Sequence, residues 1–303
     1  MRGSSGKEMQ ITIKSVGCKH RCKFCGLCLV DKEYKKPLSR EEFISQLTWA
    51  LTKLEAELAG IKKVSIIGNA HSTFTDDVIT KKALKEGIQS LADKLSSLTE
   101  LGFEAHGKYI TDKNLRELNQ SVPAKIEKEM GLGVESGIES VRRATGKNLS
   151  DKQIFDAAEK LLKAGWALRA YFIYNLPSRG HETASKDFEK MALFLATIKK
   201  LFPELRITLY ANRGYRPENI KNNPAFKDFV IASEKETMRD TISVAKICKD
   251  ADIVLDVDVT LSDEAMLNAK ALKITTSFQK AFDDFNSTQD IAALKEYLEW
   301  KKR

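Results

Sequence analysis

The sequence has little cysteine for its length, five residues in 303. Small secreted domains held by disulfides are rich in cysteine, so this small and odd number argues against a disulfide framework. No apolar run approaches the ~20 residues of a membrane-spanning helix. The sequence also contains no internal repeat and no low-complexity linker. These absences leave a globular chain of one large domain or two small ones.

Charge is the bulk property that points to a partner. The net charge is +8 at pH 7, with 30% charged and 42% hydrophobic residues, as in a soluble globular protein. Near the first three cysteines, the charged residues are Lys14, Lys19, Arg21, Lys23, Lys32, Lys35 and Lys36 against Asp31 and Glu33. Such a basic rim concentrates anionic partners and is compatible with RNA or an acidic peptide. A solvated lysine surface is the alternative.

Three of the cysteines, Cys18, Cys22 and Cys25, share one short loop with the spacing C-x3-C-x2-C. Cuboidal iron–sulfur clusters are held by cysteine thiolates, normally four of them. Three thiolates leave one iron open, and that iron can bind a small molecule and deliver an electron to it. The loop follows a predicted strand over 9–17, and catalytic residues of βα barrels lie at such carboxyl ends. We therefore predict that these cysteines are metal ligands in a radical enzyme.

A zinc site is an alternative use of the same loop. His20 lies inside it and Cys28 follows it, so a zinc knuckle is conceivable. Structural zinc usually takes two separated pairs of ligands, and nothing downstream supplies a second C-x2-C pair. Cys28 is interpreted as a packed thiol near the cluster, with a substrate-facing role as the other possibility.

The periodicity alternates between strand-like and helical segments through most of the chain. The predicted strands are 9–17, 63–68, 102–106, 126–135, 167–176 and 205–211. The predicted helices are 39–59, 81–98, 111–120, 138–145, 150–164 and 182–200. Six βα units in a row favour parallel strands with right-handed crossovers, and they are too few for a closed eight-stranded barrel. The sequence predicts an α/β fold, an open partial (βα)6 barrel.

The pattern changes after the sixth strand. A loop over 212–224 and a helix over 224–250 precede a strand over 251–259, which carries acidic residues on one face. Two further helices are expected over 262–285 and 288–302. We expect a barrel core over 9–215 and a C-terminal extension of helices and one extra strand over 216–303, packed on the barrel.

The cysteine loop resembles the signature of the radical S-adenosylmethionine (SAM) superfamily, C-x3-C-x-aromatic-C, with Phe24 as the aromatic residue. The stretch 102–177, which contains Gly131-Leu-Gly-Val-Glu-Ser-Gly137, resembles one branch of that superfamily. This branch contains the elongator catalytic subunit, cobalamin-dependent radical enzymes, methylthiotransferases and the radical subunit of archaeosine synthase. The resemblance covers roughly residues 9–215. It implies one [4Fe–4S] cluster that cleaves SAM to methionine and a 5′-deoxyadenosyl radical, which abstracts hydrogen from a substrate.

The resemblance also implies a set of cofactor contacts. Gly68-Asn69-Ala70 stands where the family has a Gly-Gly-Glu-like motif for the methionine amino group, and the match is loose. Glu135 and Ser136 correspond to residues near the ribose and the methionine. Arg169 could meet the cofactor carboxylate, or form a salt bridge with Glu104 or Glu135 instead. The expected cofactor-binding residues are Phe24, Gly68, Asn69, Ala70, Glu135, Ser136, Arg169, Tyr171 and Asn175.

Polar residues on inward strand faces supply candidates for the substrate cavity. Such residues are costly to bury unless they are paired or used. Alternation along two strands places His106, Lys108, Tyr210 and Asn212 on faces of this kind. We predict that these four contact the substrate, and ordinary hydrogen bonding is the alternative.

Three functions remain open from the sequence. The first is radical modification of RNA, in particular tRNA, favoured by the basic rim. The second is modification of a peptide or small metabolite, favoured because one cluster is expected and no RNA-binding barrel is recognised. The third is a non-enzymatic metal-binding protein. The radical readings imply a one-electron donor of the flavodoxin or ferredoxin type and no membrane partner. Reduced, cluster-binding cysteines also imply a cytoplasmic setting.

Overall fold

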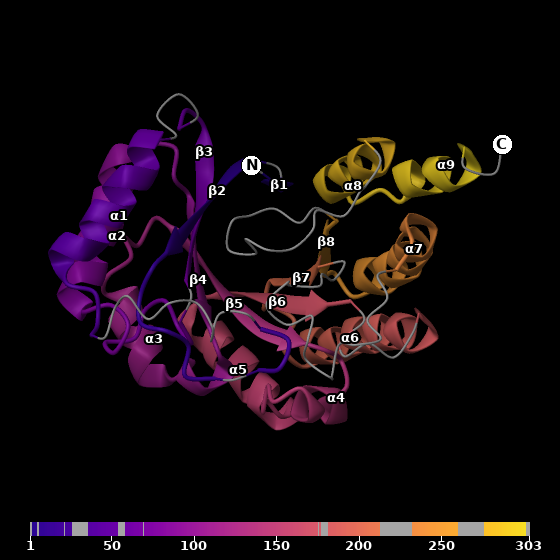
Figure 1. Ribbon diagram of the computed structural model, residues 1–303, viewed down its shortest axis with the longest axis horizontal. Helices are drawn as coiled ribbons and strands as arrows, with labels where there is room; N and C mark the ends of the chain where they lie inside the picture. Colours follow the sequence, from indigo (N-terminus) through magenta and orange to yellow (C-terminus); the bar gives the residue numbers. More distant parts are fainter. Residues whose placement is uncertain are drawn as a thin grey trace. The chain divides into compact units, whose positions relative to one another are not determined.

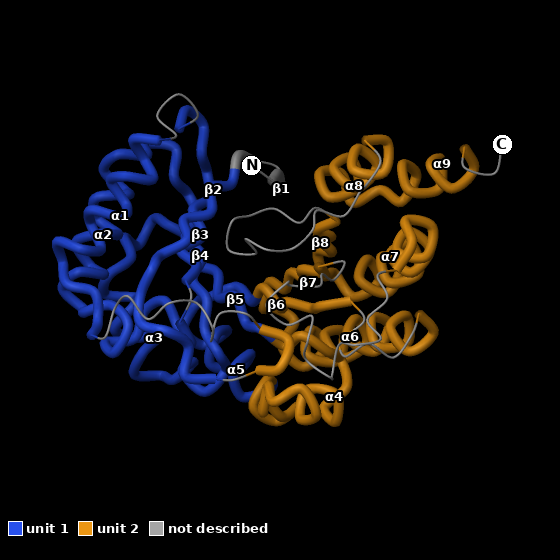
Figure 2. Tube along the Cα trace, viewed as in Figure 1, with its two compact units in different colours: residues 1–20, 27–133, 155–168 blue, residues 21–26, 134–154, 169–303 orange. Residues whose placement is uncertain are grey.

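The structure is a computed structural model of the chain. It describes residues 2–4, 6–20, 22–25, 36–53, 58–68, 70–174, 176, 181–212, 232–259 and 276–300. Two compact units divide the chain (Figure 2). Unit 1 comprises residues 1–20, 27–133 and 155–168, and unit 2 comprises 21–26, 134–154 and 169–303. Within the described ranges, no helix combines the length and apolar composition that crossing a bilayer requires.

The described strands form one eight-stranded sheet in chain order. They are β1 (Arg2–Ser4), β2 (Gly6–Ile13), β3 (Ile61–Gly68), β4 (Glu100–Ala105), β5 (Glu127–Glu135), β6 (Ala167–Ile173), β7 (Ile207–Asn212) and β8 (Val254–Asp258). β1 is antiparallel to β2, whereas β2 to β5 pair in parallel, and so do β7 and β8. Sequential parallel strands joined by helices are the topology of a partial βα barrel, which confirms the predicted fold class.

Nine helices lie in the described parts of the chain (Figure 1). They are α1 (Arg40–Lys53), α2 (Lys81–Lys94), α3 (Asp112–Asn119), α4 (Glu139–Ala144), α5 (Asp151–Ala164), α6 (His181–Leu201), α7 (Glu234–Asp250), α8 (Thr276–Thr288) and α9 (Ala292–Trp300). The capping box at the start of α1 is present: the Ser39 amide donates to Glu42 Oε2 at 2.8 Å, and the Glu42 amide donates to Ser39 Oγ at 3.3 Å.

Several boundaries differ from the sequence prediction, and the clearest is the first long strand. β2 begins at Gly6 and ends at Ile13, whereas the predicted strand ran over 9–17. The strand ends before Lys14, because the Lys14 amide and carbonyl both hydrogen-bond the side chain of Gln46 in α1, at 2.8 and 2.9 Å. α8 covers Thr276–Thr288, and the part of the predicted helix over 262–285 that precedes residue 276 lies outside the described residues. The division into a core over 9–215 and an extension over 216–303 stays a prediction.

In unit 1 the helices α1 and α2 lie side by side and cover the strands (Figure 1). Their close approach requires a glycine, because a Cβ on Gly87 would lie 2.3 Å from a Phe43 ring atom. On the sheet, buried polar groups pair with one another. Lys63 Nζ bonds Glu129 at 2.6 Å and Glu100 at 2.9 Å. Such pairing is what allows charged groups to be buried in this unit.

In unit 2 an aromatic contact joins the sheet to its helices. The Phe172 ring of β6 stacks on Phe188 of α6, with centroids 4.9 Å apart. α6 packs on α7, and α8 packs on α9. Cys248 of α7 is buried, and burial raises the pKa of its thiol to about 12. This cysteine is therefore a core residue, held in the neutral thiol form.

Candidate functional site

Unit 1 carries the first cysteine of the loop. Cys18 is half-buried and follows β2. The two residues after it are anchored: Lys19 forms an ion pair with Asp77, and the His20 ring stacks on His106 with centroids 4.1 Å apart. The start of the cysteine loop is thus held to the segments that follow β3 and β4.

The other predicted site residues of unit 1 lie at the carboxyl ends of β3 and β4. Gly68 ends β3 in a tight place, because a Cβ there would lie 3.2 Å from Thr73 Cγ2. Ala70 is half-buried, and Asn69 lies outside the described residues. His106 is buried, and its Nδ1 accepts a hydrogen bond from the backbone amide of the exposed Lys108 at 3.2 Å.

Unit 2 carries the other two loop cysteines in an apolar setting. Cys22 and Phe24 are buried together with Leu176, and Cys25 and Ile173 pack partly buried against them. This segment docks on the turn after α4. The Lys23 amide donates to the Thr145 carbonyl at 2.8 Å, and Cys22 Sγ lies 3.8 Å from the Gly146 carbonyl oxygen.

Lys147, which the sequence reasoning did not single out, lies beside these cysteines. Its Nζ bonds Glu135 Oε1 at 2.9 Å and lies 6.0 Å from the centre of the Phe24 ring. Burial alone would lower the pKa of Lys147, but the Glu135 carboxylate and the sulfurs of Cys22 and Cys25 raise it above its usual value. The Lys147 ammonium therefore lies near the sulfurs of Cys22 and Cys25 and the Glu135 carboxylate, in surroundings largely shielded from water.

Glu135 has a backbone conformation that side chains rarely adopt, with φ of 71°. A non-glycine residue in this left-handed region is strained, and such strain is concentrated at functional sites. Glu135 ends β5 and is buried, and its carboxylate is the partner of Lys147. Of the two partners considered for Arg169, Glu135 is thus already bonded to another cation.

Ser136 is fully buried in a hydrogen-bonded network. Its hydroxyl donates to the carboxylate of Asp187 at 2.8–2.9 Å and accepts from the Ile138 amide at 3.0 Å. Asp187 also accepts from the Gly137 amide at 2.8 Å. The cofactor contact expected of Ser136 stays a prediction, since its hydroxyl already has a donor and an acceptor.

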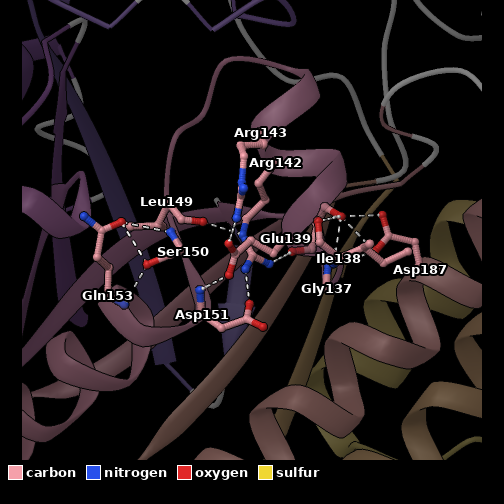
Figure 3. Close-up of polar contacts among 11 residues, drawn as sticks. Gly137, Ile138, Glu139, Arg142, Arg143, Leu149, Ser150, Asp151, Gln153 and Asp187 are labelled. Carbon is pink, nitrogen blue, oxygen red and sulfur yellow. Dashed lines mark hydrogen bonds and ion pairs between the residues drawn. The ribbon is translucent and has the colours of Figure 1, made fainter.

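Arg142 stabilises the same turn, the one that follows β5 (Figure 3). Its side chain is fully buried, and it donates from Nε to the Leu149 carbonyl and from Nη1 to the Ser136 carbonyl, both at 2.7 Å. Nη2 pairs with Asp151 at the start of α5. Arg142 and Asp187 together fix the backbone that follows Glu135.

The last strands of unit 2 carry a polar face. The Arg169 guanidinium lies 5.3 Å from the centre of the Tyr210 ring, and the Tyr171 ring meets Tyr210 edge-on. Tyr210 Oη donates to Asp258 Oδ2 at 3.1 Å. Asn212 pairs in register with Asp258. Asn175 lies outside the described residues.

The cysteines fit an iron–sulfur cluster in their chemistry. Thiolates are the usual ligands of such clusters, and the two cysteines of unit 2 lie among apolar side chains with a lysine ammonium beside them. The structure describes Cys18 in unit 1 and Cys22 and Cys25 in unit 2. Within the described residues, no group of three or more His, Cys, Asp or Glu side chains is gathered closely enough to hold a metal ion.

A pH prediction follows from Asp187. Burial raises the pKa of this carboxyl from 3.8 to about 6, although Ser136 and Gly137 donate to it. The folded state then binds the proton more tightly than the unfolded state, so ionisation of Asp187 costs stability as pH rises from about 4 to about 6. Full ionisation costs about 3 kcal/mol, an order of magnitude set by the shift.

We expect Asp187→Asn to remove this loss, because the asparagine oxygen can still accept both hydrogen bonds. The measurement is the free energy of unfolding in urea at pH 4, 5, 6 and 7. At each pH, the difference between the wild type and the variant gives the contribution of Asp187. An unchanged difference across that range would contradict the assignment.

Comparisons with known proteins identify the family and the fold. The radical SAM superfamily matches residues 12–195. An uncharacterized protein of Methanocaldococcus jannaschii is 23% identical over 98% of this chain and 81% of its own length. The crystal structure of methylornithine synthase is similar with a TM-score of 0.55 at 12% identity, over 97% of this chain and 82% of that one. The Elp3 structure from Methanocaldococcus infernus has a TM-score of 0.51 at 15% identity, over 80% of this chain and 54% of that one.

Proposed function

We propose that this chain, which belongs to the radical SAM superfamily, abstracts hydrogen from an RNA substrate, in particular a tRNA. Enzymes of this superfamily use a [4Fe–4S] cluster and SAM, and they need a reductant and a substrate. A flavodoxin- or ferredoxin-type protein is proposed as the electron donor. When bound, the cluster and SAM together supply one-electron cleavage of the sulfonium and the abstraction of a substrate hydrogen.

The described residues have distinct tasks in this proposal. Cys18, Cys22 and Cys25 provide thiolates. Phe24, with Leu176 and Ile173, keeps water from the unit 2 cysteines. Glu135 and Lys147 present opposite charges beside them, suited to the ammonium and carboxylate of an amino acid group. His106, Lys108, Tyr210 and Asn212 remain the proposed substrate contacts.

The observation that supports an RNA substrate is the charge around the cysteine loop. Four described lysines there, Lys14, Lys19, Lys23 and Lys36, are exposed. Lys19 is partly neutralised by its ion pair with Asp77. Lysines bind phosphates mainly through their charge. Their contribution to RNA affinity is therefore independent of the RNA sequence and falls as the salt concentration rises.

The test is anaerobic binding of total tRNA over a salt series. We expect Lys14→Gln combined with Lys23→Gln to weaken binding and to reduce the slope of log affinity against log salt by about 1 for each lost phosphate contact. Lys280→Gln combined with Lys295→Gln, exposed lysines of α8 and α9, is the matched control. Equal losses of tRNA affinity in both double variants would contradict an RNA-binding rim. An affinity that does not change with salt concentration would contradict it as well.

A small cationic metabolite or a basic peptide is the second candidate. It is favoured by the acidic residues of β8, since Asp258 is buried beside Tyr210 and Asp256 pairs in register with Tyr210. A buried carboxylate next to a tyrosine hydroxyl suits an ammonium group. A mass change in a metabolite or peptide fraction, with tRNA unchanged, would decide for this candidate.

A further inference from the structure

A histidine–aspartate pair in unit 1 belongs to none of the roles above. His71 lies three residues after β3, and its side chain has no exposed surface. Its Nε2 lies 3.1 Å from Asp77 Oδ2. This position is at the carboxyl end of a parallel strand, where catalytic groups of βα folds are placed.

The partner determines which nitrogen of His71 carries the proton. Burial raises the pKa of Asp77, but the hydrogen bond from Lys19 and the neighbouring His71 and Lys19 charges bring it down to about 2. The carboxylate is therefore ionised at neutral pH and can only accept a hydrogen bond. Nε2 must be the donor, which leaves the lone pair on Nδ1.

Nδ1 of His71 is buried, and no residue that the structure describes hydrogen-bonds to it. Burial lowers the pKa of His71, and the Lys19 and Lys108 charges lower it further, while Asp77 opposes them. The ring is thus neutral at pH 7. A buried acceptor without a hydrogen-bond donor costs folding free energy. A bound group that donates to Nδ1 would remove this cost.

The surroundings place this lone pair beside the cysteine loop. The Tyr109 ring lies 4.4 Å from the His71 ring, and the His20 ring lies 6.4 Å from it. The Cys18 sulfur acts on Tyr109 electrostatically, and Lys19, the next residue, is the other partner of Asp77. The charged and titratable neighbours of His71 are therefore Asp77, Lys19, Lys108, His20 and Tyr109.

We propose that His71 is a general base of this enzyme, which takes a proton through Nδ1 from a substrate hydroxyl or amino group, and that Asp77 positions it. The O–H or N–H bond breaks with its electron pair left on the substrate, and the proton forms a bond to Nδ1. The imidazolium so formed is balanced by the Asp77 carboxylate, and no electron enters or leaves. The proposal holds for a ribose hydroxyl and for a small hydroxylated or amino substrate alike.

The first test needs no substrate. In holoenzyme labelled with ¹⁵N-histidine, we expect His71 to show a non-protonated Nδ1 and a protonated Nε2 at pH 7, with the signal assigned by its loss in His71→Gln. The sequence has four histidines, which keeps the assignment simple. Asp77→Asn, whose amide can donate to Nε2, should move the proton to Nδ1. A proton on Nδ1 in the wild type, or a doubly protonated ring at pH 7, would overturn the proposal.

The second test measures turnover with total tRNA, and separately with the small-molecule fraction of a cell extract, as probes. Product formation should fall about 100-fold in His71→Gln, the scale of a lost general base. Imidazole should partly restore product formation in His71→Gly.

The matched control is His181→Gln, because His181 also pairs with an aspartate, Asp240, at 3.0 Å, and is more exposed. Equal losses in the two variants, or full product formation in His71→Gln, would show that His71 is structural. If neither probe stimulates the wild type, the RNA proposal and its alternative fail together, and the nitrogen spectrum still decides the state of His71.

Discussion

Replacing Cys22 with alanine is expected to abolish cluster assembly and with it all release of 5′-deoxyadenosine. Cys22 is buried against Phe24 and Leu176, and alanine leaves the apolar contacts of this segment largely in place. The variant removes one thiolate from a set of three, fewer than the usual four ligands even when complete. The measurement is iron and sulfide content and visible absorption after anaerobic reconstitution, followed by the 5′-deoxyadenosine assay.

Cys248→Ala is the matched control for that experiment. Cys248 is as buried as a core residue can be, at 1% exposed, and the pKa of its thiol is raised to about 12. A thiol held in its neutral form does not bind metal, so this variant should keep the full iron content. Normal iron content in Cys22→Ala would contradict the assignment of the loop as the cluster site, as would its loss in Cys248→Ala.

The second large effect is expected at Arg142. Arg142→Met keeps an apolar stem but removes the donors to the buried carbonyls of Ser136 and Leu149. Leaving a buried acceptor unsatisfied costs about 1–3 kcal/mol each, so the free energy of unfolding should fall by about 3–5 kcal/mol. Asp151 is half-exposed and can regain water, so its loss adds little. Urea unfolding followed by circular dichroism measures the change.

The neighbouring arginine provides the comparison. Arg143 is 71% exposed and pairs with Glu139 one helical turn away, an arrangement that contributes only a few tenths of a kcal/mol. Arg143→Met should therefore leave unfolding nearly unchanged. Similar losses in both variants would mean that the turn after β5 does not depend on the buried guanidinium. Weaker SAM binding in Arg142→Met alone would further tie this turn to the cofactor.

Much of the fold was predictable because the signals are local. The capping box of Ser39 and Glu42 at the start of α1 spans only four residues, and the alternation over 251–259 predicted β8. The end of β2 was not predictable. Residues 14–17 continue the strand pattern, but the backbone of Lys14 bonds Gln46, which lies 32 residues away.

The candidate site divides in the same way. The cysteine spacing is a local signal, and the family match over 12–195 agrees with the family that it indicated. Lys147 and Asp187 were missed because their importance comes from burial beside Glu135 and Ser136, which only the folded chain shows. His71 follows a predicted strand, but that no described residue bonds its Nδ1 is a property of tertiary packing.

The most direct test of the central claim is anaerobic reconstitution with iron and sulfide, followed by dithionite and SAM and an assay for 5′-deoxyadenosine. The proposed chemistry predicts slow release without substrate and faster release when total tRNA is added. Stimulation by a peptide or metabolite fraction in place of tRNA would keep the radical enzyme and change its substrate. A protein that holds an intact cluster and never cleaves SAM would contradict the account, and the cysteine loop would then be a passive metal site.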